Sequence, residues 1–513
     1  MAFFNRNLLA AALCAALGLT TAASTSAEEI TVAVGSGFTT LDPYDATDLL
    51  SRTVSESFYE GLFIYDKNMK VVPQLAESYE MSPDGLVYTV KLKSGVKFHD
   101  GTMFDAEAVK KNVERVLNPD NHLSRRNYYT VIDKVEVVDP LTVRFVLKHP
   151  MGTFLNRLAT GTVVMVCPKS IDEGVDLAFK PCGTGPYVMK DYNPSERLHV
   201  VKNPDYRVPG LPKLDGIIWR PVIENATRAA MVRTGEAAFA HPMPAEQIKV
   251  LQNYSNVDII VQPSIVVRYL FLNNLQKPFT DPRVRQAINY AINKEALAKV
   301  AFSGYARPVT GVVPEKIDMA AKTGPWPYDP KKARELLKEA GYPQGFETEL
   351  WSGYNNTTAQ KAIQFIQQQL RQVGIKTTLR SLEAGQRVAL VESVQDPMKA
   401  GMRLYYIGWS NSTAEVDLGL RPLFHSESWA PVLANEGFYK NPDVDRLLDD
   451  AIREPDEGKR RALYGEVQQK IWQDAPWAFL VTEDVTGASS KKLKNFRLDA
   501  AGGYDFYEAE LVK

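Results

Sequence analysis

The chain is poor in cysteine and histidine, with 3 cysteines and 6 histidines among 513 residues. It also contains no Gly-x-Ser-x-Gly elbow, no His-Glu-x-x-His, no Cys-x-x-Cys and no phosphate loop ending in Gly-Lys-Ser/Thr. These absences disfavour the hydrolases, metalloproteases, redox enzymes and nucleotide-binding enzymes that carry such motifs. No two histidines have the spacing of a helical or hairpin metal site, so no metal centre is predicted: His99, His122, His149, His199, His241 and His425.

An excess of charge of one sign is lacking too, as is any long apolar run after the first residues. The chain has 60 basic and 61 acidic side chains, so nothing indicates a nucleic-acid-binding surface. Near its start, Arg6 precedes an apolar run over 8–19 and then small residues. This order is typical of a secretory signal peptide, and the run is shorter than the roughly 20 residues that span a bilayer. We expect a signal peptide over 1–27 and a soluble protein exported to the periplasm.

Two cysteines remain after removal of the signal peptide, Cys167 and Cys182. Export to an oxidising compartment favours a disulfide between them, with two buried free thiols as the alternative. The two positions lie 15 residues apart, so the bridge would contribute about 3 kcal/mol by the loop-entropy estimate. The pair is therefore predicted to be a local staple.

Strand and helix patterns alternate along the rest of the chain. Segment 134–147 alternates apolar and polar residues about an Asp-Pro turn and predicts a β-hairpin. Segments 330–340, 357–373 and 442–451 place apolar residues at helical spacing. Mixed helices and strands in a long chain indicate an α/β fold with two or three folding units.

No Pro/Ser-rich linker separates these units, so any boundary must be a strand that crosses from one to the other. Residues 265–274 are the expected crossing, and residues 477–485 the expected return.

Segment 94–110 holds His99, Asp100, Asp105 and Glu107, a density of ionisable groups that suits a metal site or acid/base catalysis. Each group also has a structural interpretation. The first two belong to an Asp-Gly turn, Asp105 caps a helix, and Glu107 lies in the first helical turn, where the dipole favours an anion. We favour the structural interpretation because it needs no partner base.

Segment 75–116, followed in order by 182–192, 277–292, 328–342 and 405–413, resembles the extracytoplasmic peptide- and nickel-binding proteins that feed ABC importers. The resemblance covers essentially the whole mature chain. Within that family, the segments "VGSGFTTLDPYDATD" and "LPKLDGIIWRPVIENATRAAMVRTGEA" look like the glutathione-binding branch.

The resemblance implies an α/β, two-lobed periplasmic-binding-protein clamshell of the large type, without catalysis or cofactor. Lobe I is expected to comprise residues 28–266 and 484–513, with an extra subdomain inserted at about 63–185, and lobe II residues 267–483. In such proteins a hinge closes the lobes on the ligand, and a permease recognises the closed state. The implied protein is a monomer that delivers glutathione, or a similar small peptide, to an ABC import permease.

Both charged clamps of ordinary peptide recognition in this family are missing. Dipeptide-binding relatives carry an aspartate for the peptide amine three residues after the Trp of a Gly-Trp motif; counted from Trp409, that position is Ser412. They also place an arginine for the peptide carboxylate in the stretch matching 352–358, which has no basic residue here. This favours a ligand whose ammonium and carboxylate share one carbon, as at the γ-glutamyl end of glutathione.

The expected ligand-binding residues follow from position in the resemblance. Arg125 lies where a nickel-binding relative places an arginine on its ligand, so it is an expected carboxylate partner, with a solvated surface arginine as the alternative. Arg268 and Arg387 are further candidates for the same role. The others lie on loops that line clefts between α/β lobes, with packing or capping as the alternative: Phe38, Thr39, Thr40, Tyr354, Asn355, Trp409, Asn411 and Ser412.

Other functions stay open at this point. A protein of the same family could bind other di- or oligopeptides, a nickel chelate or haem. An exported hydrolase and a receptor that presents its ligand to a signalling protein are the alternatives outside that class.

Overall fold

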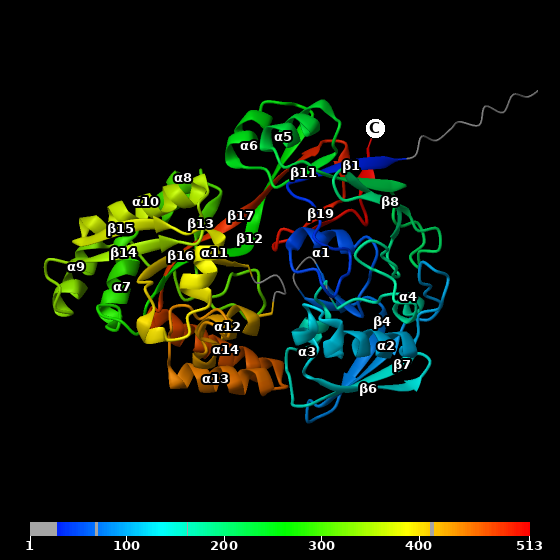
Figure 1. Cartoon of the computed structure of the whole chain (residues 1–513), viewed down its shortest axis with the longest axis horizontal. Coiled ribbons are helices and arrows are strands. Elements are labelled where there is room, and N and C mark those ends of the chain that lie inside the picture. Colours follow the sequence, from blue (N-terminus) through cyan, green and yellow to red (C-terminus); the bar gives the residue numbers. More distant parts are fainter. Residues whose placement is uncertain (1–27, 67–69, 162, 411–414, 513) are drawn as a thin grey trace, which may run out of the picture.

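The computed structural model describes residues 28–66, 70–161, 163–410 and 415–512. Two bodies lie side by side and are joined by long strands (Figure 1). Within these residues, one sheet of 11 strands runs through both bodies, with β13 (Ala306–Pro308) paired to β17 off the main path. The main path follows the order β15 (Ile375–Ser381), β14 (Phe346–Ser352), β16 (Leu404–Ser410), β12 (Val257–Leu272), β17 (Trp477–Ser490), β11 (Phe239–His241), β1 (Glu29–Val34), β10 (Gly216–Pro221), β9 (Arg197–Lys202) and β8 (Tyr187–Asn193).

Strands β12 and β17 connect the bodies. They have 16 and 14 residues and pair antiparallel along nearly their whole length. The register shifts between Pro263 and Val267 and again between Arg268 and Tyr269. Because such irregularities bend a strand and increase its twist, they suit a passage between two bodies. The expected return lies within β17, and the expected crossing extends two residues beyond the end of β12, while the residue limits of the lobes stay a prediction.

We call the body with β14–β16 lobe II. The two faces of its sheet pack against two different groups of helices, because successive side chains of a strand point to opposite faces. Leu270 and Leu404 lie in a core with α7 (Pro282–Ala291), α8 (Lys294–Ala301), α9 (Pro330–Glu339) and α10 (Thr357–Gln372). Tyr269 and Tyr405 lie in a core with α12 (Arg421–Phe424), α13 (Pro442–Arg453) and α14 (Glu457–Asp474).

The helices predicted for lobe II are confirmed, and side chains cap the first turns of α9 and α13. The Asp329 carboxylate accepts a hydrogen bond from the backbone of Lys332 at the start of α9, N···O 2.9 Å. The Asn441 side chain does the same for α13. A cap satisfies backbone N–H groups that have no partner within the helix, which is why these residues mark helix starts in the sequence.

Lobe I is the other body. In it, β1 is flanked by the parallel strands β10 and β11, and α5 (Asn225–Thr234) and α6 (Ala245–Leu251) pack against this part of the sheet. A separate sheet has the order β4 (Ala76–Met81), β5 (Val87–Leu92), β7 (Thr142–Leu147) and β6 (Ile132–Asp139), and α2 (Ala106–Leu117) packs on it. Strands β6 and β7 form the predicted hairpin, which is thus confirmed.

No helix among the described residues is long and apolar enough to cross a membrane.

The remaining elements are short. The short helices are α1 (Leu49–Ser55), η1 (Pro119–Asn121), η2 (Arg126–Tyr128), α3 (Phe154–Leu158), α4 (Pro168–Asp172), α11 (Ala384–Arg387), η3 (Val388–Glu392), η4 (Pro397–Lys399), η5 (Asp417–Gly419) and η6 (Ser426–Ser428), and the short strands are β2 (Phe63–Tyr65), β3 (Val71–Pro73), β18 (Leu493–Lys494), β19 (Arg497–Leu498), β20 (Tyr504–Asp505) and β21 (Glu510–Leu511).

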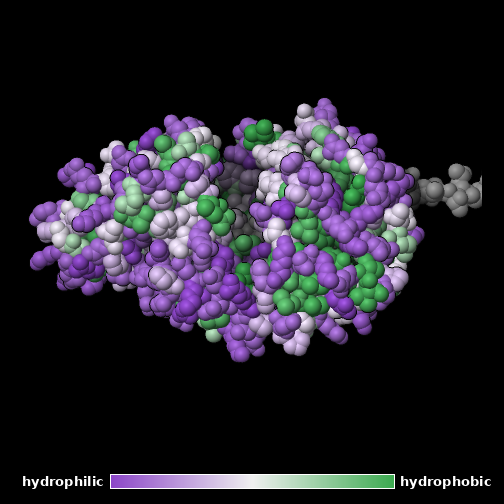
Figure 2. Space-filling model, turned by 60° about the horizontal axis from the view of Figure 1, so that its bottom comes forward, coloured by the Kyte–Doolittle hydropathy of each residue, from purple (hydrophilic) through white to green (hydrophobic). Residues whose placement is uncertain are grey.

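Figure 2 shows a deep hollow between the two lobes. Besides the long strands, the lobes touch where the chain before α3 approaches the end of α13. There the Gly152 N–H donates to the Ile452 carbonyl, N···O 2.8 Å. A Cβ at this glycine would lie 2.3 Å from the Glu454 carbonyl oxygen, so the approach of the two backbones requires a glycine. We call this second contact, together with the adjoining contacts of Thr153 and Arg157 with Glu415, the latch.

Candidate functional site

The acidic segment 94–110 is scaffold. The Asp105 carboxylate accepts from the Ala108 N–H at the start of α2, N···O 2.9 Å, and Asp100 accepts from the backbone and hydroxyl of Thr102. The structural interpretation of this segment is confirmed.

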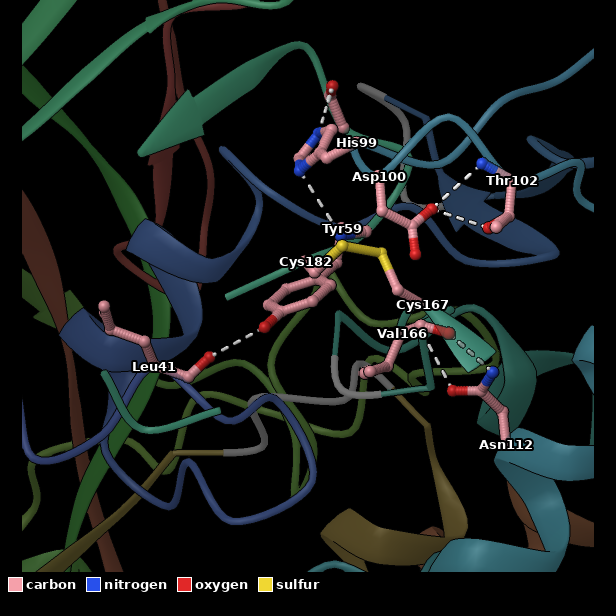
Figure 3. Close-up of a disulfide and its surroundings, with 11 residues drawn as sticks. Leu41, Tyr59, His99, Asp100, Thr102, Asn112, Val166, Cys167 and Cys182 are labelled. Atoms are coloured by element: carbon pink, nitrogen blue, oxygen red, sulfur yellow. Dashed lines mark hydrogen bonds between the residues drawn. A yellow bond between two sulfur atoms is a disulfide. The ribbon is translucent and has the colours of Figure 1, made fainter. Parts of the chain in front are cut away.

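The predicted disulfide is confirmed as well. Cys167 and Cys182 are joined, with Cα atoms 5.4 Å apart, beside Asp100 (Figure 3). Ligand atoms of these three residues lie within 4.8 Å of one another. Sulfur in a disulfide is no thiolate, however, and the thiolate is the form that binds a metal. This group is therefore not a metal site.

The expected residues of lobe II lie at one edge of its sheet. Strand β14 pairs parallel with both β15 and β16. Tyr354 and Asn355 follow β14, Arg387 follows β15, and Trp409 is the second-last residue of β16. Carboxyl ends of parallel strands meet at the same edge, which is where open α/β sheets bind ligands.

Arg268 of β12 joins this edge, but its charge is already paired. Its guanidinium bonds Glu483 with N···O distances of 2.7 and 3.2 Å and lies 4.7 Å from the centre of the Tyr354 ring. Burial works against the charge of Arg268, but the Glu483 carboxylate outweighs burial, so that the pKa of Arg268 is raised. A ligand carboxylate would have to compete with Glu483.

Arg387 forms an ion pair with Glu392, with its Nε 2.7 Å from a carboxylate oxygen, but this Nε makes no hydrogen bond within the described residues. Glu436 lies behind this pair. Burial, and then the negative charge of Glu392, raise the pKa of Glu436 to about 8. The hydroxyl of Tyr405 is buried nearby and has no hydrogen-bond partner among the described residues. This wall thus offers a paired arginine and an unused neutral donor.

The other predicted residues of lobe II differ in what they contact. The Asn355 amide donates to Glu383, N···O 3.0 Å. Trp409 is partly buried, and its indole N–H lacks a partner in the described part of the chain. A buried donor without a partner costs free energy, so it is a suitable group for a ligand to complete. Asn411 and Ser412 lie outside the described residues.

Phe38, Thr39 and Thr40 form the loop after β1 in lobe I, and each has a structural contact. The ring of Phe38 lies 6.3 Å from that of Tyr192. The Thr39 hydroxyl donates to Asp48, O···O 2.5 Å, and the buried Thr40 hydroxyl accepts from the backbone N–H two residues further on, N···O 3.0 Å. The loop therefore has the packing and turn contacts given above as its alternative role.

Arg125 lies beside Tyr128. Its Nε and one terminal nitrogen donate to the Ala46 carbonyl, N···O 2.9 and 2.6 Å, and its guanidinium lies 5.4 Å from the centre of the Tyr128 ring. No carboxylate among the described residues forms an ion pair with Arg125. The guanidinium of Arg157 lies over the same ring at 5.9 Å and is 3.6 Å from Glu415 of lobe II.

Helix α1 carries Arg52 and is followed by its C-cap residue Glu56, and neither of these charged residues was predicted. The one hydrogen bond of the Arg52 side chain within the described chain goes to the Asp48 carbonyl, N···O 3.4 Å. Burial, and then the positive charge of Arg125, lower the pKa of Arg52. The carboxyl of Glu56 makes neither a hydrogen bond nor an ion pair with any described residue. Opposite charges four positions apart usually form a solvated pair on a helix surface, so the sequence contains no signal for this pair.

The comparisons with known proteins agree with this architecture. The sequence model of the bacterial extracellular solute-binding proteins, family 5 Middle, matches residues 70–431. The chain is similar to the glutathione-binding protein GsiB of Pectobacterium atrosepticum, with 52% identity over 489 residues, which is 95% of this chain and 95% of the relative. It is 51% identical over 501 residues to GsiB of Escherichia coli strain K12, covering 97% and 98% of the two chains.

Solved structures share the two-lobed fold. The periplasmic binding protein DppA from Helicobacter pylori, in complex with the peptide STSA, matches with a TM-score of 0.76 and 29% identity over 94% of this chain and 98% of that one. HbpA2 from Haemophilus parasuis matches with a TM-score of 0.85 and 23% identity, covering 94% and 100%.

Proposed function

Because the chain belongs to the bacterial extracellular solute-binding proteins of family 5, we propose that it captures glutathione, or a similar small peptide, between its two lobes. The observation that carries this proposal is the identity of 52% to a glutathione-binding protein across 95% of both chains. A likeness of that extent includes the loops of both lobes, so it is more specific than a shared fold.

The chemistry of the hollow supports this ligand. Glutathione has two carboxylates, one ammonium, two amides and a thiol, so its site needs guanidinium groups, an acceptor and neutral donors. Arg125 on lobe I, Arg268 and Arg387 on lobe II and the indole of Trp409 are our proposed contacts. Tyr354 and Asn355 complete the lobe II wall, and Phe38, Thr39 and Thr40 border lobe I.

We also propose a cellular role, which membership of the family supports. The protein works in the periplasm as a monomer, catalyses no reaction and hands its ligand to an ABC import permease. The signal-peptide pattern over residues 1–27 supports export, and the hinge strands support a motion that changes the surface presented to the permease.

Another peptide is the second candidate for the ligand, since the solved DppA relative holds the peptide STSA. The sequence argues against an ordinary α-peptide, because neither charged clamp of dipeptide recognition is present. A nickel chelate or haem is less well supported, because the histidines are scattered along the chain.

Titration calorimetry with reduced glutathione, oxidised glutathione and a panel of α-dipeptides tests the proposal. We expect binding of glutathione in one or both redox forms and weak or no binding of the dipeptides. Binding of the dipeptides without binding of glutathione would overturn the choice of ligand and leave the family in place.

A further inference from the structure

Helix α1 lies on the side of lobe I that is turned toward lobe II (Figure 1). The Asp48 carboxylate caps it by accepting from the Ser51 N–H, N···O 2.9 Å. Arg52 and Glu56 are four positions apart, so they project from the same side of the helix. Both are half-buried and keep part of their surface accessible. A guanidinium and a carboxyl thus lie about one helical turn apart at the helix that faces lobe II.

The Arg52 side chain makes no ion pair within the described chain, although the carboxyls of Asp499 and Glu56 favour its charge. Arg125 is the first of the charged neighbours that act on it, and this neighbour is also a cation. Two guanidinium groups that lie close together without a carboxylate partner repel each other, and partial burial makes the repulsion more costly. An anion that binds between them removes this cost.

Glu56 makes no ion pair within the described chain, and its charged neighbours from the C-terminal segment are engaged with other groups. The groups that face it are Arg52 on its own helix and three residues of the C-terminal segment, Arg497, Asp499 and Asp505. Arg497 pairs with Asp505, N···O 2.7 Å, and Asp499 accepts the N–H groups of residues 501 and 503. The Glu56 carboxyl is therefore free to bind a cation.

The space beside Glu56 is kept open by a glycine. A Cβ placed on Gly161 would lie 3.3 Å from a carboxyl oxygen of Glu56, closer than most real contacts of a Cβ. A larger side chain at this position would cover the carboxyl.

We propose that Arg52 and Glu56 bind the α-amino-acid head of the ligand, with Arg52 and Arg125 holding its carboxylate and Glu56 receiving its ammonium. The assignment rests on the proposed function and names the part of the ligand that is recognised. In an α-amino-acid head the two charges share one carbon, which matches two side chains one turn apart. The ends of an α-dipeptide are separated by a peptide unit and do not match this spacing.

The test combines variants with trimmed ligands. Calorimetry compares the wild type, Glu56→Gln and Arg52→Gln with three ligands: glutathione, its analogue without the α-ammonium (glutaryl-cysteinyl-glycine) and its analogue without the α-carboxylate (γ-aminobutyryl-cysteinyl-glycine). Glu80→Gln, a substitution at an exposed position of lobe I, is the matched control. Thermal unfolding of every variant checks that it is folded.

We expect Glu56→Gln to weaken glutathione binding about tenfold and to change binding of the analogue without the ammonium by less than about threefold. Arg52→Gln should weaken glutathione binding about tenfold and leave the analogue without the carboxylate nearly unchanged. Equal losses for glutathione and the trimmed ligand, or no loss, overturn the assignment. If the wild type binds no glutathione, the proposed function fails, and this assignment fails with it.

Discussion

The two walls of the hollow carry similar charged residues in different states. On lobe II, Arg268 is paired with Glu483 and Arg387 with Glu392, each at 2.7 Å. On lobe I, Arg52 and Glu56 make no ion pair within the described chain. The same residue types therefore offer different chemistry, because a paired ion must first lose its partner before it can bind a ligand.

This difference suggests that the two lobes bind different parts of the ligand. An unpaired charge that faces water gains a partner on binding, whereas exchange of one carboxylate for another brings little free energy. Lobe I then holds the α-amino-acid head of the ligand. Lobe II closes over the remainder with its paired arginines and with neutral donors such as the indole of Trp409.

The largest effect expected concerns stability and separates the scaffold of lobe I from its binding surface. Replacing Cys167 and Cys182 by alanine should lower the free energy of unfolding by about 3 kcal/mol, since the disulfide closes a loop of 15 residues. Denaturant unfolding measures this change. Glutathione affinity of the folded variant should stay within about twofold, and a larger loss would mean that the staple positions the binding surface.

The effects of one arginine substitution on each lobe compare the two walls directly. Arg52→Ala should weaken glutathione binding by about 1.5–3 kcal/mol, the range for a charge-assisted hydrogen bond. Arg387→Ala should cost less than about 1 kcal/mol, because this guanidinium is already neutralised by Glu392. Calorimetry measures both, and an equal or larger loss for Arg387→Ala would remove the contrast between the lobes.

A smaller effect is expected from pH. Burial, and then the negative charge of Asp505, raise the pKa of Glu56 to about 8, with Asp499 adding to and Arg497 and Arg52 opposing the shift. A ligand ammonium favours the charged carboxylate, so binding lowers this pKa and releases a proton. Affinity should therefore rise about tenfold from pH 6.5 to pH 8, where the unliganded carboxyl becomes half ionised.

Glu56→Gln is the control for this pH series, because it cannot ionise and should remove most of the rise. Buffers with different ionisation heats report the proton released on binding. A pH profile that is the same in the variant and the wild type would mean that another group titrates.

The smallest effect is expected at the latch, where neither wall is altered. The Thr153 hydroxyl donates to Glu415, O···O 2.5 Å, and Arg157 lies 3.6 Å from the same carboxylate. Burial raises the pKa of Glu415, although Arg157 opposes this. Glu415→Gln keeps an acceptor for Thr153 and should weaken glutathione binding by about twofold to fivefold.

Small-angle scattering should show that this variant is on average more open than the wild type. Addition of glutathione should restore the closed population. An unchanged shape and affinity would mean that the latch does not contribute to closure.

Local features could be predicted from the sequence because their signals lie close together in the chain. Asp105, Asp329 and Asn441 begin helices by capping them, and an Asp-Pro turn marks the hairpin of β6 and β7. Such contacts depend on residues only a few positions apart.

The state of the charges could not be predicted, because it depends on contacts across the fold. Arg268 is paired with a residue 215 positions away. The sequence shows an arginine at an expected crossing strand but not that β17 brings Glu483 to it. Glu56 is the reverse case. Its spacing from Arg52 is that of an ordinary helix pair, yet it makes no ion pair within the described chain, and its neighbours from the far end of the chain are engaged elsewhere.

A crystal structure of the protein with glutathione tests the central claim most directly. The account predicts the γ-glutamyl carboxylate within hydrogen-bond distance of Arg52 and its ammonium on Glu56, with the Arg268–Glu483 and Arg387–Glu392 pairs intact. A γ-glutamyl head bound by Arg268 or Arg387, with those pairs broken and α1 away from the ligand, would contradict it.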